Sequence, residues 1–223
     1  MSPHSPATPL SAARWWSRRA VRGFYTPLVT HGTYRILWGC HVRHVTGLYL
    51  NAVSDGDSVL EIGAADGAHL DRADRHDLRV HLLDAFPGSL RAASERLERY
   101  SPTPHLADAL EPFPLAESSV DAVLMSMVLH CLPGRSIAEK DAVFGHIARV
   151  LRPGGKVAGA TVLAEGVPHT RRSRAGLAVL NKLGLFSCYR DSLVDLEHAL
   201  GARFDRVKVF RVGSVALWQG VGR

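Results

Sequence analysis

Acidic residues accompany three of the short apolar runs in the first half of the chain. Glu61 lies in VLEIG, Asp84 closes HLLD, and Asp108 ends a shorter run, PHLAD. Because parallel strands end at one edge of a sheet, side chains at successive strand ends converge there. A carboxylate after the second run can accept both hydroxyls of a ribose, and Asp108 followed by the small Ala109 suits an adenine amino group. These residue types and spacings predict a site for a nucleoside-like ligand.

A turn of small residues, GAADG, follows Glu61. The dinucleotide pattern G-x-G-x-x-G, aligned on Gly63, needs glycines at positions 65 and 68, where this chain has alanines, so NAD or FAD binding is not expected. The pattern acidic-x-G-x-G-x-G fits better, because only Ala65 replaces a glycine between Gly63 and Gly67. Small residues let the backbone pass close to a ligand, and Ala65 serves equally well if its φ is negative. A tight strand-to-helix turn without a ligand carries similar residues, so the turn alone does not decide the matter.

The elements that must position these residues alternate from residue 57 onward. Strand-like SVLEIG, LRVHLLDA, VDAVLMSMVL and KVAGATVL alternate with helical AHLDRADR, PGSLRAASERLERY and IAEKDAVFGHIARVL, with a short PHLADA between. This order predicts βαβ units and a mostly parallel, doubly wound α/β sheet. Residues 172–186 and 191–201 are predicted helices, the second capped by Asp191. RVKVFRVG and SVALWQGV follow each other almost directly, so they must pair antiparallel and the last strand runs against the rest.

Length and composition favour one domain with a small appendage. We expect a disordered tail over residues 1–12, short helices over 13–52 and the main domain over 53–223. No run approaches the ~20 apolar residues of a membrane helix, and no secretory signal is recognisable. Three cysteines without a CxxC pair indicate reduced thiols in a cytoplasm, and neither disulfides nor a metal site are expected.

The net charge of +6 comes mostly from arginine spread along the chain. A basic face can meet nucleic acid or an acidic substrate, whereas scattered arginines also fit a solvated surface, which we favour. No aromatic-basic pattern of RNA-recognition modules is present. The two local clusters are Arg14, Arg18, Arg19 and Arg22, and Arg171, Arg172 and Arg174.

The segments VLEIGAADG, HLLDAFPGSL, LADALEPFPLAESSVDAVLMSMVLHCLP and ARVLRPGGKV resemble the class I S-adenosylmethionine-dependent methyltransferases over about residues 57–162. FYTPLVTHGTYRILWGC, LGLFSCYRDSL and VGSVALWQG further resemble a bacterial and fungal subgroup of small-molecule methyltransferases. The resemblance implies a Rossmann-like α/β fold. Its doubly wound, mostly parallel seven-stranded sheet has an antiparallel last strand, and residues 13–52 form a small helical lid.

The resemblance also implies the cofactor S-adenosylmethionine, with S-adenosylhomocysteine as product and no metal. Ala65 departs from the family's glycine, which is expected to change cofactor affinity or tilt the loop without removing the ribose contact. The implied contacts are Glu61, Gly63, Ala64, Ala65 and Gly67 at the methionine part; Asp84 at the ribose; Ala85, Phe86, Asp108 and Ala109 at the adenine; Ser126 and Met127 near the methyl group; and Tyr25 at the carboxylate.

His130 is the predicted general base, because it follows the fourth strand on the side of the methyl group and has an ordinary pKa of about 6.5. A histidine in an HxLP turn also fits a residue that caps or packs the turn over residues 128–132, so both roles stay open. His31, Tyr34 and Tyr189 are expected to line the acceptor pocket with His130. Cys131 is expected to be a small buried filler.

The leading hypothesis is methyl transfer to an O, N, S or C atom of a small metabolite in specialised biosynthesis. The sulfonium methyl is already electrophilic, so positioning supplies much of the catalysis and no fixed catalytic set is required. The alternatives are an RNA or protein methyltransferase that uses the basic clusters, and a non-methylating enzyme such as a cyclase that keeps the cofactor. MSMVLH stands where many nucleic-acid N-methyltransferases have an NPPY-like motif, so a nucleic acid is not favoured. The acceptor and the oligomeric state stay open.

Overall fold

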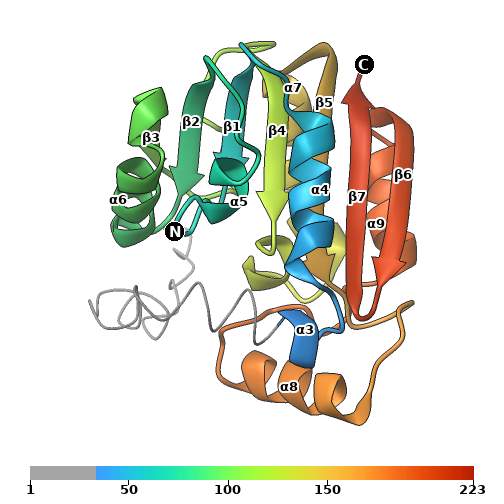
Figure 1. Cartoon of the computed structure of the whole chain (residues 1–223). Coiled ribbons are helices and arrows are strands. Elements are labelled where there is room, and N and C mark those ends of the chain that lie inside the picture. The colour runs from blue at the N-terminus through green and yellow to red at the C-terminus, as the bar shows by residue number, and fades with distance from the viewer. Residues whose placement is uncertain (1–33) are drawn as a thin grey trace, which may run out of the picture.

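The computed structural model describes residues 34–223 and builds them around one seven-stranded sheet (Figure 1). The strand order is β3-β2-β1-β4-β5-β7-β6, and strands β1 to β5 pair in parallel. Strand β7 pairs antiparallel with both of its neighbours, which confirms the predicted doubly wound sheet with a reversed last strand. The strands are β1 Ser58–Ile62, β2 Arg79–Asp84, β3 Thr103–Leu106, β4 Val120–Ser126, β5 Leu151–Val162, β6 Phe204–Val212 and β7 Val215–Gly222.

Helices cover both faces of the sheet, because alternate residues of each central strand point to opposite sides. Ala122 and Leu124 of β4 pack beneath α4, α5 and α6, whereas Val123 and Met125 pack beneath α7 and α9. No helix within residues 34–223 is long and apolar enough to cross a membrane. The helices are α3 Tyr34–Ile36, α4 Val42–Ala52, α5 Ala68–Asp71, α6 Pro87–Arg96, α7 Ala142–Val150, α8 Arg171–Lys182 and α9 Leu193–Gly201, with 3₁₀ turns η2 Glu98–Tyr100, η3 Leu129–Cys131 and η4 Ile137–Lys140.

Three local expectations differ from the structure. The stretch AHLDRADR forms only the four-residue helix α5, and Asp74 beyond it takes a positive φ that ends any helix. Helix α4 packs on β4, β5 and β7, so the end of the predicted lid belongs to the sheet's helical layer. Ser192, rather than Asp191, caps α9, because its hydroxyl accepts the N–H of Asp195 at 3.0 Å. The predicted tail and the first part of the lid, with Tyr25 and His31, lie outside the described residues.

The parallel strands end at one edge of the sheet, and the loops after β1, β2, β4 and β5 meet there. Helices α3 and α8 lie beyond this edge, at the bottom of the view in Figure 1. Trp38, which follows α3, stacks on Phe186, which follows α8, with ring centroids 5.8 Å apart. Segments from distant parts of the chain therefore close over the strand ends.

Candidate active site

The turn after β1 passes through three residues with positive φ: Gly63 at +66°, Ala65 at +49° and Gly67 at +72°. A Cβ at Gly63 would lie 2.2 Å from a methyl carbon of Val128, so a side chain is excluded there. Ala65 adopts the left-handed conformation, whereas from the sequence alanine is expected to fit this turn only with a negative φ. An L-residue other than glycine pays about 1–2 kcal/mol in this region. The replacement of glycine by Ala65 is therefore less conservative than expected.

Glu61 is buried in β1 with only one of its carboxylate oxygens engaged. The Tyr49 hydroxyl of α4 donates to Oε1 at 3.2 Å, whereas Oε2 has no hydrogen-bond partner in the described part of the chain. Burial raises the pKa of Glu61 to about 8, Asp66 and Asp84 raise it further, and the Tyr49 bond opposes this. A buried acceptor without a donor costs free energy, and a cationic ligand group removes that cost. Oε2 thus fits the ammonium group of the S-adenosylmethionine that the sequence implies.

Asp84 ends β2 and is held by backbone donors. Its Oδ1 accepts the N–H of Phe86 at 2.9 Å, and the nearby backbone amides of Ala65 and Ala85 also lower its pKa. Burial outweighs these hydrogen bonds and raises the pKa of Asp84 to about 6. The structure therefore brings the predicted ribose acceptor against the turn after β1. An ionised carboxylate has two acceptor oxygens, so the side chain of Asp84 can accept hydrogen bonds from both hydroxyls of a ribose.

The predicted adenine residues lie beside one another after β2 and β3, but with unequal exposure. Ala109 is buried, Phe86 is half-buried and Ala85 is exposed. Asp108 is exposed, and its Oδ1 accepts the N–H of Leu110 at 2.9 Å, which closes a local turn. The second oxygen of Asp108 is the one suited to an adenine amino group.

An aromatic cluster that the sequence does not predict lies beside the turn after β1. Tyr34 stacks on His69 with centroids 6.1 Å apart, and the ring of Tyr49 lies 5.5 Å from the same imidazole. Burial lowers the pKa of His69 to about 4, so this histidine is neutral. Tyr34, predicted at the acceptor pocket, thus lies in the group that adjoins Glu61. Tyr49 belongs to the apolar face of α4, where the sequence indicates only a core residue.

Met127 follows β4 with a φ of +61°, and its N–H donates to the carbonyl of Ala160 at 2.6 Å. Non-glycine residues in this region are uncommon and are held there only by their surroundings. Ser126 beside it is buried at the end of the strand. Both residues therefore lie at the strand-end edge, as the sequence predicts, and the backbone there is tied to β5.

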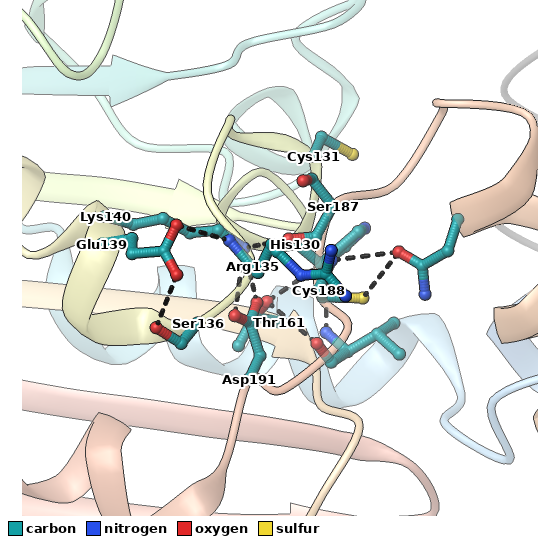
Figure 2. Close-up of polar contacts among 12 residues, drawn as sticks. His130, Cys131, Arg135, Ser136, Glu139, Lys140, Thr161, Ser187, Cys188 and Asp191 are labelled. Atoms are coloured by element: carbon teal, nitrogen blue, oxygen red, sulfur yellow. Dashed lines mark hydrogen bonds and ion pairs between the residues drawn. The ribbon is translucent and has the colours of Figure 1, made fainter.

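His130 is 2% exposed and lies between β5 and the segment after α8 (Figure 2). The backbone N–H of Val162 donates to Nδ1 at 3.2 Å, and Thr161 Oγ1 lies 3.2 Å from the same nitrogen. Burial lowers the pKa of His130 to about 3, and the charge of Lys140 adds to this. Because an N–H can only donate, the Val162 contact assigns Nδ1 as an acceptor and the proton of the neutral ring to Nε2. In this tautomer the Thr161 hydroxyl donates to Nδ1 instead of to the carbonyl of Val162, which lies 3.3 Å away. This geometry argues against the predicted general base and agrees with the packed alternative.

A buried ion pair ties the loop after β4 to the segment after α8 (Figure 2). Lys140 Nζ donates to Asp191 at 2.8 and 3.0 Å and to the carbonyl of Ser187 at 2.8 Å, and both charged side chains are 0% exposed. The N–H of Ser187 in turn donates to the carbonyl of His130 at 2.8 Å. Asp191, expected to cap a helix, instead satisfies an ammonium group that lies 51 residues away in sequence.

Two other acceptor-side expectations change. Tyr189 is 45% exposed, and its hydroxyl donates to the carbonyl of Asn181 at 3.0 Å while Arg135 lies over its ring. The Tyr189 hydroxyl is therefore hydrogen-bonded to the end of α8, and this contact does not support its predicted place in the acceptor pocket. Cys131 is exposed rather than a buried filler, whereas Cys188 is buried. Within residues 34–223, no group of three or more His, Cys, Asp or Glu side chains is placed to hold a metal ion.

Comparisons with known proteins agree with this geometry. A family model described as "Methyltransferase domain" matches residues 60–157. The demethylluteothin O-methyltransferase of Streptomyces thioluteus is 40% identical over 90% of this chain and 87% of that protein. The N-methyltransferase vrtF of Penicillium aethiopicum is 32% identical over 82% of this chain and 76% of that protein. The crystal structure of geranyl diphosphate C-methyltransferase from Streptomyces coelicolor A3(2) is similar in fold, with a TM-score of 0.69, 15% identity, and coverage of 99% of this chain and 100% of that one.

Proposed function

Because the chain belongs to the class I S-adenosylmethionine-dependent methyltransferases, we propose that it methylates a hydroxyl oxygen of a small natural product. The similarity to the demethylluteothin O-methyltransferase, which spans nearly the full length of both proteins, is the observation that carries the choice of oxygen. The bound cofactor supplies a sulfonium methyl group. The protein's part is to orient the acceptor in line with it and to exclude water.

We assign the cofactor contacts to the strand-end loops. Glu61 and the turn from Gly63 to Gly67 hold the methionine part, with Glu61 Oε2 facing the ammonium group. Asp84 accepts the ribose hydroxyls, and Phe86 borders the adenine. The support for this assignment is the unpartnered Oε2, the close approach that only glycine allows at position 63, and the donors that orient Asp84.

Deuteromethyl S-adenosylmethionine and demethylluteothin test the proposal directly. Mass spectrometry is expected to show one deuteromethyl group on the oxygen of the product, with one S-adenosylhomocysteine formed per turnover. Methylation of a nitrogen or carbon atom of a compound in a metabolite extract would show that the acceptor atom is not a hydroxyl oxygen. Turnover without S-adenosylhomocysteine would instead support a non-methylating enzyme such as a cyclase. Isothermal titration with the cofactor is the control, because failure to bind would contradict the site itself.

A second function keeps one observation in its favour. Arg171, Arg172 and Arg174 are exposed in the first turn of α8. An RNA methyltransferase that uses this cluster would retain RNA in a strongly salt-dependent manner. We expect no such retention, and replacement of the three arginines by serine is expected to leave methylation of demethylluteothin unchanged.

A further inference from the structure

We propose that the acceptor hydroxyl enters the site already ionised, and that His130 binds the oxyanion as a hydrogen-bond donor through Nε2 instead of removing a proton. This inference rests on the proposed function and names its substrate class. The acceptor is a hydroxyl acidic enough to ionise in neutral water, such as an enol of a dicarbonyl compound or a phenol with an electron-withdrawing group. Aliphatic alcohols are outside this class.

The backbone beside His130 determines the tautomer of its imidazole ring. The N–H of Val162 points at Nδ1 from 3.2 Å, and a backbone amide has no lone pair to offer in return. A proton on Nδ1 would face that N–H and lose the hydrogen bond. A general base acting through Nε2 needs its proton on Nδ1, which is the arrangement that Val162 disfavours.

The other ring nitrogen of His130, Nε2, carries the proton and is left to donate. Nε2 has no hydrogen-bond partner within residues 34–223, although the ring is almost completely buried and packs 4.1 Å from Phe186 between centroids. Nε2 itself is not fully buried, so its N–H is free to donate to water or to a bound acceptor. An oxyanion beside Nε2 supplies that acceptor and makes a charge-assisted hydrogen bond.

Several ionisable groups surround His130, as Figure 2 shows. The Asp191 carboxylate is bound to Lys140, and Glu139 bonds the N–H of Arg135. Burial raises the pKa of the Cys188 thiol to about 12, so this group stays neutral. None of these groups is placed to accept a proton from an acceptor hydroxyl.

The reaction balances without a base on the protein. The hydroxyl loses its proton to water before it binds, and the oxyanion then forms an O–CH₃ bond as the S–CH₃ bond breaks. The electron pair of the broken bond stays on sulfur, which gives a methyl ether and S-adenosylhomocysteine. Negative charge on the oxygen decreases during this step, so the bond from Nε2 is stronger to the bound acceptor than to the transition state. His130 is thus expected to govern acceptor binding more than the rate of methyl transfer.

Variants of His130 separate the two roles with demethylluteothin as acceptor. His130→Ala is expected to raise KM by about 10- to 100-fold with kcat changed only a few-fold, because a bond to a charged group is lost. His130→Gln keeps an N–H donor and is expected to restore most of the affinity. A loss of about 10²–10⁴ in kcat in both variants would show a general base and overturn the proposal. His198→Gln, on the exposed side of α9, is the matched control.

The pH dependence gives a second kinetic test. The value of kcat/KM is expected to rise to a plateau at the pH where free demethylluteothin ionises, as read by its own ultraviolet titration. The proposal would be overturned by an inflection in the pH profile of kcat/KM that the titration of the free acceptor does not show and that His130→Gln removes, because such an inflection would report the titration of His130.

Nitrogen-15 NMR of the imidazole needs no acceptor and therefore separates failure of this inference from failure of the proposed function. In the complex with S-adenosylhomocysteine, the signals absent from His130→Gln are expected to show a proton on Nε2 and a bare Nδ1 between about pH 5 and 9. A proton on Nδ1 would overturn the inference even if methylation is observed. A proton on Nε2 without O-methylation would leave the assigned tautomer correct and refute the proposed function.

Discussion

The proposed cofactor side (Glu61, Asp84 and the turn after β1) and the proposed acceptor side (His130, Lys140 and Asp191) differ in how their buried charges are partnered. On the cofactor side, burial raises the pKa of Glu61 to about 8 and that of Asp84 to about 6, and Glu61 Oε2 lacks a donor in the described residues. On the acceptor side, Lys140 and Asp191 bind each other, and burial keeps His130 neutral while the N–H of Val162 donates to its Nδ1. The buried carboxylate of Glu61 thus depends on a ligand for its missing partner, whereas the Lys140–Asp191 ion pair is complete without one.

The largest effect on stability is expected from breaking the Lys140–Asp191 ion pair. Lys140→Met leaves the Asp191 carboxylate buried without its cation, which is expected to lower the free energy of unfolding by about 3–5 kcal/mol. Denaturant unfolding measures the loss. The double variant Lys140→Met/Asp191→Leu is expected to recover most of it, since neither charge then remains buried. Equal losses in the single and double variants would show that packing, and not charge, dominates at this pair.

The contribution of Glu61 to stability is expected to depend on pH. Because the folded-state pKa of Glu61 is raised to about 8, only the folded protein holds this proton between the ordinary carboxyl pKa and that value. Stability without cofactor is therefore fully present at low pH and falls as pH rises, by up to about 1.4 kcal/mol for each pH unit between 5 and 8. Unfolding of the wild type and Glu61→Gln across this range measures the contribution. Parallel curves for the two proteins would contradict the raised pKa.

Asp84 tests whether the ribose lies where the donors around its carboxylate indicate. Asp84→Ala is expected to weaken binding of S-adenosylmethionine by about 1–3 kcal/mol, because two ligand hydroxyls lose their acceptor. Isothermal titration gives the affinity. Asp108→Ala is the comparison, with a smaller loss because Asp108 is exposed. Unchanged affinity in Asp84→Ala would place the ribose elsewhere.

The smallest effect is expected at Ala65. Ala65→Gly relieves the left-handed strain at φ +49° but gives the unfolded chain more freedom, so a net gain of about 0.5–1 kcal/mol in stability is expected. Ala64→Gly is the matched control and is expected to lose stability, because Ala64 is buried and has no positive φ. Thermal unfolding compares the two. A loss in both variants would show that the loop is not strained.

The sheet could be predicted from the sequence because its signals are local. Each parallel strand is a short apolar run next to a helical period, and the near-absence of a linker between the last two runs dictates their antiparallel pairing. The same locality explains the cofactor side, where Glu61, Gly63 and Asp84 lie at strand ends in one continuous stretch. The conformation of Ala65 was not predictable, because its residue type permits either sign of φ.

The acceptor side could not be predicted because its contacts join residues far apart in sequence. His130 meets Thr161 across 31 positions, and Lys140 meets Asp191 across 51. Histidine as a residue type is compatible with either a base or a donor, and only the N–H of Val162 distinguishes them. Likewise, the position of Asp191 just before α9 indicates a helix cap, and only the structure shows that its partner is the buried Lys140.

The Lys140–Asp191 pair also determines how this protein can be recombined with its relatives. Residues 129–140 and 163–192 form one unit of exchange, although the helix α7 and the strand β5 separate them along the chain. A chimera that imports only residues 163–192 from a relative would place the relative's residue 191 against Lys140 of this protein. Engineers who wish to alter acceptor preference should therefore swap the two segments together.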